Sequence, residues 1–152
     1  MIHMQNTKIA QMVAPAAIVD NDDPVGARGD ANPVSVDTNG YDYASVYLHI
    51  GATDIAVTSS VYEGDSVASG ADDSDFTAIT GADFGAAAAA DEDNGFWVCH
   101  IDLRGRKRHL LLECLVGDGT AGAFVTAFCI LSRGKEAPTT AAERGLTNEA
   151  IV

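Results

Sequence analysis

Apolar and polar residues alternate along much of this chain, and the alternation is clearest in its second half. Three apolar runs occupy residues 96–103, 109–116 and 123–131, and the segments RGRKR and GDGTAG separate them. A period of two places successive side chains on opposite faces of a β-strand. Because only short Gly-containing breaks intervene, the pattern predicts an antiparallel meander in which these strands pair as neighbours.

An earlier pair of runs repeats this alternation. Residues 41–50 and 55–62 are joined by a Gly-containing turn and are expected to form a strand pair. One face of the first run is apolar, and the other carries Tyr41, Tyr43, Ser45, Tyr47 and His49. A face rich in Tyr and Ser suits contact with another protein, so Tyr41, Tyr43 and Tyr47 are candidate interface residues. Exposed Tyr is also common on sheets that have no partner, and the sequence leaves both interpretations open.

The remaining segments complete an all-β chain. Residues 12–19 form a candidate edge strand, because Pro15 cannot donate to a central ladder. Residues 76–80 are a candidate short strand, and residues 81–95, with five consecutive alanines, favour neither a loop nor a short helix over the other. In the tail, Thr139 or Thr140 can cap a turn of helix that ends at Gly145.

Seven or eight strands within about 120 residues predict an antiparallel β-sandwich or a jelly-roll-like fold. We expect a flexible N-terminal arm with an edge strand and a loop over residues 1–33, the sandwich core over 34–132, and a short C-terminal tail over 133–152.

Composition narrows the classes of partner. The chain has 152 residues, of which 47% are hydrophobic, so it is long enough to bury the core of one domain. A net charge of −13 disfavours binding to nucleic acid or to an anionic membrane surface. No apolar run approaches the roughly 20 residues that span a bilayer. Polar residues between Gln5 and Gln11 interrupt any signal-peptide core, so export is not indicated.

The cysteines and the acidic clusters are the residues that could ligate a metal. Cys99, Cys114 and Cys129 each share strand parity with apolar neighbours, so we expect free thiols facing the core. A three-thiolate metal site lacks the CxxC pair or the nearby His that would support it. Acidic clusters at 20–23, 72–75 and 91–94 are oxygen-rich, as Ca²⁺ prefers, but none matches an EF-hand loop. We therefore expect no metal and no other cofactor.

Catalytic patterns are weak throughout the chain. The sequence contains no GxSxG, HExxH, Walker A or GxGxxG motif. His49, His100 and His109 fall on polar faces of their predicted strands, where solvated or interface histidines are expected. We therefore expect that the protein is not an enzyme. The tripeptide Arg28-Gly29-Asp30 is too short to indicate cell adhesion, and Gly29 is expected to be a loop hinge.

One basic segment stands out in this acidic chain. Arg104, Arg106, Lys107 and Arg108 occupy a predicted hairpin tip. They are candidate interface residues for an acidic surface, either on a partner or on a sister copy. The alternative is a polar turn whose charges protect the edges of its own strands, and the two interpretations have equal weight.

Three segments carry a resemblance to a known family. They are DTNGYDYASVYLHIGATDIAV at 37–57, NGFWVCHIDLRGRKRHLLLECLVGDGTAG at 94–122, and AFCILSRGKEAPTTAAERG at 127–145. Together they resemble the capsid decoration, or cement, proteins of tailed bacteriophages, over roughly residues 34–145. At His109 the family more usually has an aromatic residue. The resemblance implies a β-rich virion protein, made in the host cytoplasm, that binds the capsid exterior.

The partners implied by this resemblance are the major capsid protein and further copies of the chain, with a trimer favoured. Such a protein would stabilise the shell by bridging subunits and binding the assembled state preferentially. The first alternative is a carbohydrate-binding β-sandwich that uses Tyr41, Tyr43, Tyr47 and Trp97 as stacking platforms, although Trp97 shares parity with core residues. A small hydrolase or isomerase on a jelly roll is the least favoured class.

Overall fold

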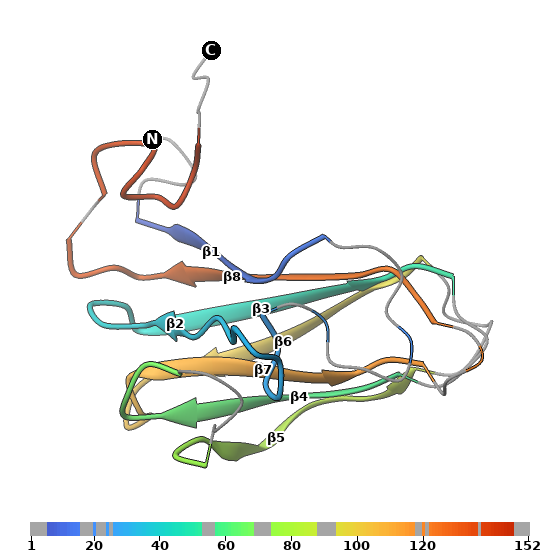
Figure 1. Cartoon of the computed structure of the whole chain (residues 1–152). Coiled ribbons are helices and arrows are strands. Elements are labelled where there is room, and N and C mark those ends of the chain that lie inside the picture. Colours follow the sequence, from blue (N-terminus) through green and yellow to red (C-terminus); the bar gives the residue numbers. More distant parts are fainter. Residues whose placement is uncertain are drawn as a thin grey trace.

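The computed structural model describes residues 6–15, 20, 24, 26–52, 57–68, 74–87, 94–117, 120, 122–136 and 138–147. The described chain is all-β and forms two antiparallel four-stranded sheets that pack face to face (Figure 1). The predicted β-sandwich is therefore confirmed. The strands are β1 (Lys8–Val13), β2 (Val36–Asp37), β3 (Tyr43–Ile50), β4 (Val57–Gly64), β5 (Thr77–Ala87), β6 (Phe96–Asp102), β7 (His109–Leu115) and β8 (Val125–Ser132).

The order of the strands differs from the predicted meander. The first sheet has the order β1-β8-β3-β6 and the second sheet has the order β2-β7-β4-β5. Consecutive strands β6, β7 and β8 therefore alternate between the sheets, and so do β3 and β4. The predicted pairing of these neighbours is wrong. Alternation determines which side chains face inward. It does not determine whether the next strand lies beside the first in the same sheet or opposite it in the other sheet.

The core lies between the inward faces of the two sheets. Strands β3 and β8 alternate strictly between buried and partly exposed residues, as their sequences predict. The fully buried side chains include Val46, Leu48, Val61, Leu112 and Leu131. Because these residues come from strands of both sheets, the same contacts hold the two layers together.

The cysteines face the core, as predicted. Cys114 and Cys129 are buried, Cys99 is half-buried, and no disulfide links them. Burial raises the pKa of the Cys129 thiol to about 12. The pKa of Cys99 is also raised, first by burial and then by the nearby carboxylate of Asp83. These thiols behave as small apolar groups at neutral pH.

Strand β5 is longer than the sequence suggests. It runs through Gly81 to Ala87, so the expectation of a loop or a short helix is wrong for these residues. Ala and Gly have low intrinsic strand preference, but the ladder with β4 supplies the hydrogen bonds that hold them extended. The ladder is irregular, with register shifts on both sides of Ser60. Residues 88–93 lie outside the described residues.

The N-terminal edge strand forms earlier than predicted. It pairs with β8 and ends before Pro15, and residues 16–19 lie outside the described residues. The C-terminal segment lies along its free edge, where the Ile9 N–H donates to the Arg144 carbonyl at 2.7 Å (Figure 1). The predicted cap is confirmed, because Thr140 Oγ1 accepts from the Glu143 N–H at 3.2 Å. The Glu143 carboxylate in turn accepts from the Thr140 N–H at 3.1 Å, which completes a capping box.

Candidate functional site

The outer face of the first sheet gathers aromatic side chains from three strands. Tyr43, Tyr47 and His49 point outward from β3, as the alternation predicts. The register sets them beside outward residues of β6 and β8. We call this set the aromatic face: Tyr43, Tyr47, His49, Phe96, Val98, His100 and Phe128.

Stacked ring pairs order the aromatic face across the strands. Tyr47 stacks on Phe128 of β8 with ring centroids 5.2 Å apart and planes 12° apart. His49 stacks on Phe96 of β6 at 4.2 Å and 11°. Tyr43 stacks on His100 at 5.9 Å, and His100 Nδ1 lies 3.0 Å from the Ser45 hydroxyl. Such cross-strand pairs hold the rings in place before any partner arrives.

This face is exposed and nearly free of charge. Phe96 is 68% exposed and Val98 is 44% exposed, and Phe124 beside the sheet is 56% exposed. Strands β3, β6 and β8 contain a single charged side chain, Asp102, whose carboxylate accepts from Arg104 Nε at 2.9 Å. Among the described residues, Arg133 is the one cation that lies over these rings, 5.9 Å from the Tyr43 centroid. Exposed aromatic area with so little charge is the composition that favours contact with another macromolecule.

The three candidate tyrosines do not lie together. Tyr43 and Tyr47 belong to the aromatic face, but Tyr41 precedes β3 and packs partly against the core. Its ring lies so close to Gly134 that a Cβ there would be 3.0 Å away. Burial, and next the charge of Glu143, raise the pKa of Tyr41. Tyr41 is thus a packing residue under the C-terminal segment.

The basic segment joins β6 of the first sheet to β7 of the second sheet, so it forms an arch between the sheets. The prediction that it is a hairpin tip is therefore wrong. Each of its four cations meets a carboxylate of the same chain. Arg106 reaches Glu63 at 3.4 Å and Lys107 reaches Asp65 at 3.6 Å, both at the end of β4. The arch is therefore largely neutralised within the chain.

The remaining two arginines of the arch hold their carboxylates in the ionised form. Arg108 contacts Asp37 of β2 at 2.7 Å. This hydrogen bond lowers the pKa of Asp37 to about 2, against the opposing effect of burial. Arg104 likewise lowers the pKa of Asp102 through a side-chain hydrogen bond.

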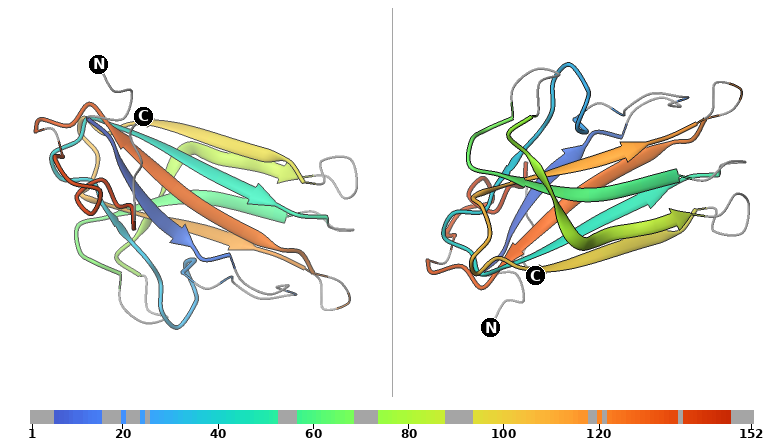
Figure 2. Two further views of the ribbon diagram at one scale, coloured as in Figure 1. Left: turned by 90° about the horizontal axis from the view of Figure 1, so that it is seen from above. Right: turned by 90° about the horizontal axis from the view of Figure 1, so that it is seen from below.

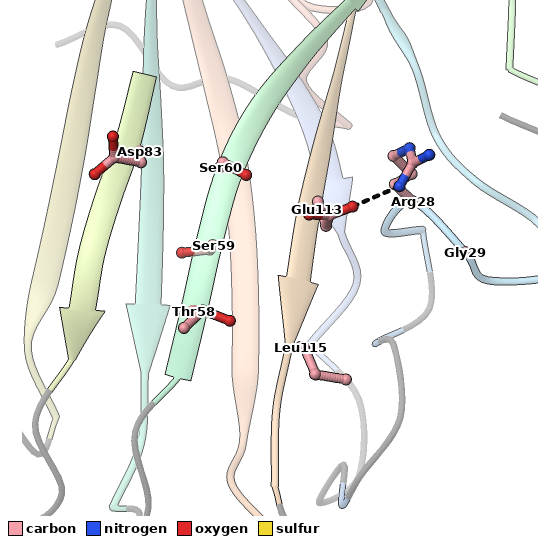
Figure 3. Close-up of a pocket in the computed structure, with 8 residues that line it drawn as sticks. All are labelled: Arg28, Gly29, Thr58, Ser59, Ser60, Asp83, Glu113 and Leu115. Carbon is pink, nitrogen blue, oxygen red and sulfur yellow. Dashed lines mark hydrogen bonds and ion pairs between the residues drawn. The ribbon is translucent and has the colours of Figure 1, made fainter. Parts of the chain in front are cut away.

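A second group of polar residues lies on the outer face of the second sheet, bordering an open hollow of about 530 Å³ (Figure 3). Arg28 Nη1 donates to Glu113 Oε2 at 2.5 Å, and Arg28 also lies over the Tyr62 ring, 4.6 Å from its centroid. The Tyr62 hydroxyl donates to Glu113 Oε1 at 3.0 Å. The sequence did not predict this group, because its members come from a loop and two strands far apart in the chain. Both oxygens of Glu113 are engaged within the group, so it forms a structural cluster.

The histidines divide into two kinds. His49 and His100 lie on the outward face, as predicted. His109 lies on the same face of β7 as Glu113, but it is buried, with 5% of its surface exposed, so the expectation of a solvated histidine is wrong for this residue. It begins β7 and pairs with Asp37 of β2 on one side and with Gly64 of β4 on the other.

Within the described residues no group of His, Cys, Asp and Glu side chains is arranged to hold a metal ion. Over that same part of the chain, no helix has the length and apolarity required to traverse a bilayer. No protein-family model matches the sequence, and a search of the curated proteins also finds no match.

Proposed function

We propose that this chain is a structural virion protein that binds the outer surface of an assembled capsid and stabilises it by bridging capsid subunits. The observation that carries the proposal is the aromatic face, which is exposed, ordered and nearly uncharged on a chain of net charge −13. The protein would be made in the host cytoplasm and act on the capsid exterior. Its partner would be the major capsid protein.

The physical case rests on what binding requires. Aromatic residues dominate the energetics of protein interfaces, because they bury a large area with few rotatable bonds. Here the stacked pairs of β3 with β6 and β8 already fix the ring orientations, so little side-chain entropy is lost on contact. The outer face of the second sheet carries Arg28, Glu113 and Asp83 and can remain in solvent.

The choice of a capsid as partner rests on the sequence resemblance. The resembling segments at 37–57 and 94–122 contain β3 and β6, which build most of the aromatic face. The carbohydrate-binding alternative is supported less well, since Trp97 packs against the core and Tyr41 lies under the C-terminal segment.

The test uses undecorated capsid shells and purified protein. We expect saturable binding and a higher melting temperature of the shells, because a ligand of the assembled state stabilises that state. Truncation of a central aromatic by Tyr47→Ala should weaken binding about 30-fold, as loss of about 2 kcal/mol at an interface implies.

The matched control is Leu115→Ala, which removes an exposed apolar side chain from the opposite sheet. It should bind shells like the unaltered protein. Equal affinity for free and assembled capsid subunits, or unchanged binding of Tyr47→Ala, would contradict the proposal.

A further inference from the structure

Strand β6 presents an open edge on the first sheet. It pairs with β3 from Tyr43 to His49 without a register shift, and no partner strand lies on its other side within the described residues. Figure 2 shows β6 as the outermost strand at this side of the molecule in both views. Strand β5 of the second sheet contacts β6 but forms no ladder with it.

The hydrogen-bond pattern identifies which groups of β6 point outward. The Ile50 N–H donates to Gly95, and the Leu103 N–H donates to Asp42 at 3.0 Å. In an antiparallel ladder, residues that exchange hydrogen bonds alternate with residues that do not. Odd-numbered residues of β6 therefore bond to β3. The outward edge is formed by the N–H and C=O groups of Phe96, Val98, His100 and Asp102.

The other three edges of the sandwich are protected. The edge of β1 is met by the C-terminal segment through Ile9 and is followed by Pro15. Strand β2 has only two residues, and β5 has an irregular register. Natural proteins block exposed edges with such devices or with Lys and Pro, and β6 contains neither residue type.

We propose that a second copy of this chain pairs antiparallel with β6 about a two-fold axis at Cys99, joining the two first sheets into one continuous sheet. A strand that pairs with its own copy about a two-fold axis is necessarily antiparallel. The pairing places Phe96 opposite Asp102 of the second copy and Val98 opposite His100 of the second copy. Every outward amide and carbonyl of β6 then finds a partner.

The residues at the two ends of β6 restrict the register to the one centred at Cys99. A centre at Val98 would bring Asp102 opposite Asn94, whose φ of 58° is incompatible with an extended strand. A centre at His100 would bring Phe96 opposite Arg104, which lies in the turn after β6. Only the centre at Cys99 pairs the strand over its full length.

The outward groups of β6 are self-complementary about Cys99, and the low charge of this edge permits a second copy to occupy it. Two chains of net charge −13 repel each other, so self-association is confined to places where charge is low. The β6 edge carries one carboxylate, Asp102, which Arg104 neutralises. In the proposed register the two Asp102 residues are about 20 Å apart, given about 3.4 Å per residue. The aromatic faces of both copies become one surface.

The experiment compares variants by sedimentation equilibrium. The unaltered protein should form a two-chain species. Val98→Pro should weaken association about 100-fold or more, because Pro removes an outward N–H and obstructs the edge. Val98→Thr keeps that N–H and should dimerise within about threefold of the unaltered protein. Pro at this position leaves the ladder to β3 intact, since the Val98 N–H does not bond to β3.

Hydrogen exchange on the unaltered protein supplies a readout that needs no variant. The outward amides of Phe96, Val98, His100 and Asp102 should exchange faster on dilution, whereas the amides of β8 should not change. A monomer at all concentrations, a three-chain mass, or a dimer that survives Val98→Pro would overturn the proposal. So would a dimer that is lost in Tyr47→Ala and kept in Val98→Pro, since that result would mean face-to-face packing. The inference does not depend on capsid binding, because a β6 dimer that ignores shells would sink only the proposed function.

Discussion

A single residue, Gly145, determines how the C-terminal segment packs against β1. Its φ is +77°, and a Cβ built there would lie 1.7 Å from the Ile9 carbonyl oxygen. Any side chain would therefore meet the backbone of β1 as well as the strain of a left-handed conformation. Gly145 follows the capping box of Thr140 and Glu143 and lets the segment lie along the strand edge.

Gly145→Ala should lower the free energy of unfolding by at least about 2 kcal/mol, since a clash adds to the backbone strain. The matched control is Gly105→Ala, at φ +80°, where the added methyl group would meet no atom within 4 Å beyond its own and the two adjacent residues. It should cost only about 1 kcal/mol, the strain of the left-handed conformation alone. Urea unfolding measures both, and equal losses would mean that the contact with β1 yields without cost.

For single residues, the sequence predicts the positions of some side chains correctly and of others incorrectly. Outward placement of Tyr43 and Tyr47 follows from alternation, because a period of two is a property of the strand itself. Tyr41 shares that parity but precedes the strand, so the C-terminal segment determines its surroundings. His109 is polar yet buried, although it lies on the same face of β7 as Glu113. Such surroundings are set by residues far away in the chain.

Among the elements, the basic arch between β6 and β7 is tied to β2 and β4 by ion pairs. Its Arg108 lowers the pKa of Asp37 from 3.8 to about 2. A carboxyl group whose pKa is lower in the folded state stabilises that state above its unfolded pKa. This stabilisation is lost as the pH falls from about 4 through about 2.

Asp37→Asn should therefore make the loss of stability between pH 4 and pH 2 shallower. At neutral pH it should cost about 0.2–1 kcal/mol, because both side chains are largely exposed. Arg108→Gln should produce a similar profile, and the double variant should add little to either one. The measurement is urea unfolding across this pH range. An acid profile identical to that of the unaltered protein would show that the pair does not act in solution.

Strand identity was largely predictable from sequence, whereas strand partners were not. The runs that form β6, β7 and β8 alternate clearly between apolar and polar residues. This alternation is the same whether the next strand lies in the same sheet or in the opposite sheet. The sequence did not predict the part of β5 from Gly81 to Ala87, and the reason is different. Its extended form depends on pairing with β4 rather than on its own residues.

At the scale of the whole molecule, the two outer faces of the sandwich differ in charge. Within the aromatic face of the first sheet no residue is acidic or basic apart from its histidines, but Asp102 borders it and the Arg133 guanidinium lies over the Tyr43 ring, 5.9 Å from its centroid. The second sheet presents Glu113 and Asp83 around the hollow in Figure 3. Since the arch cations are paired within the chain, the first sheet is the surface where another copy can approach with least repulsion.

This difference predicts the sign of the salt dependence. If copies meet along β6, added salt should strengthen self-association, because it screens the repulsion between chains of net charge −13. If the basic arch instead docked on acidic loops of a sister copy, added salt should weaken association. The screening length falls from about 10 Å at 0.1 M to about 3 Å at 1 M, so sedimentation at these two salt concentrations separates the cases.

Val98→Pro is the control for this prediction, and it should remain monomeric at both salt concentrations. A triple replacement of Arg106, Lys107 and Arg108 by Glu would be harder to interpret, because it also breaks contacts with Glu63, Asp65 and Asp37. Its effect on assembly can be interpreted only together with a measured free energy of unfolding of the same variant. Dissociation of the unaltered dimer as salt rises would return the basic arch to the interface and remove β6 from it.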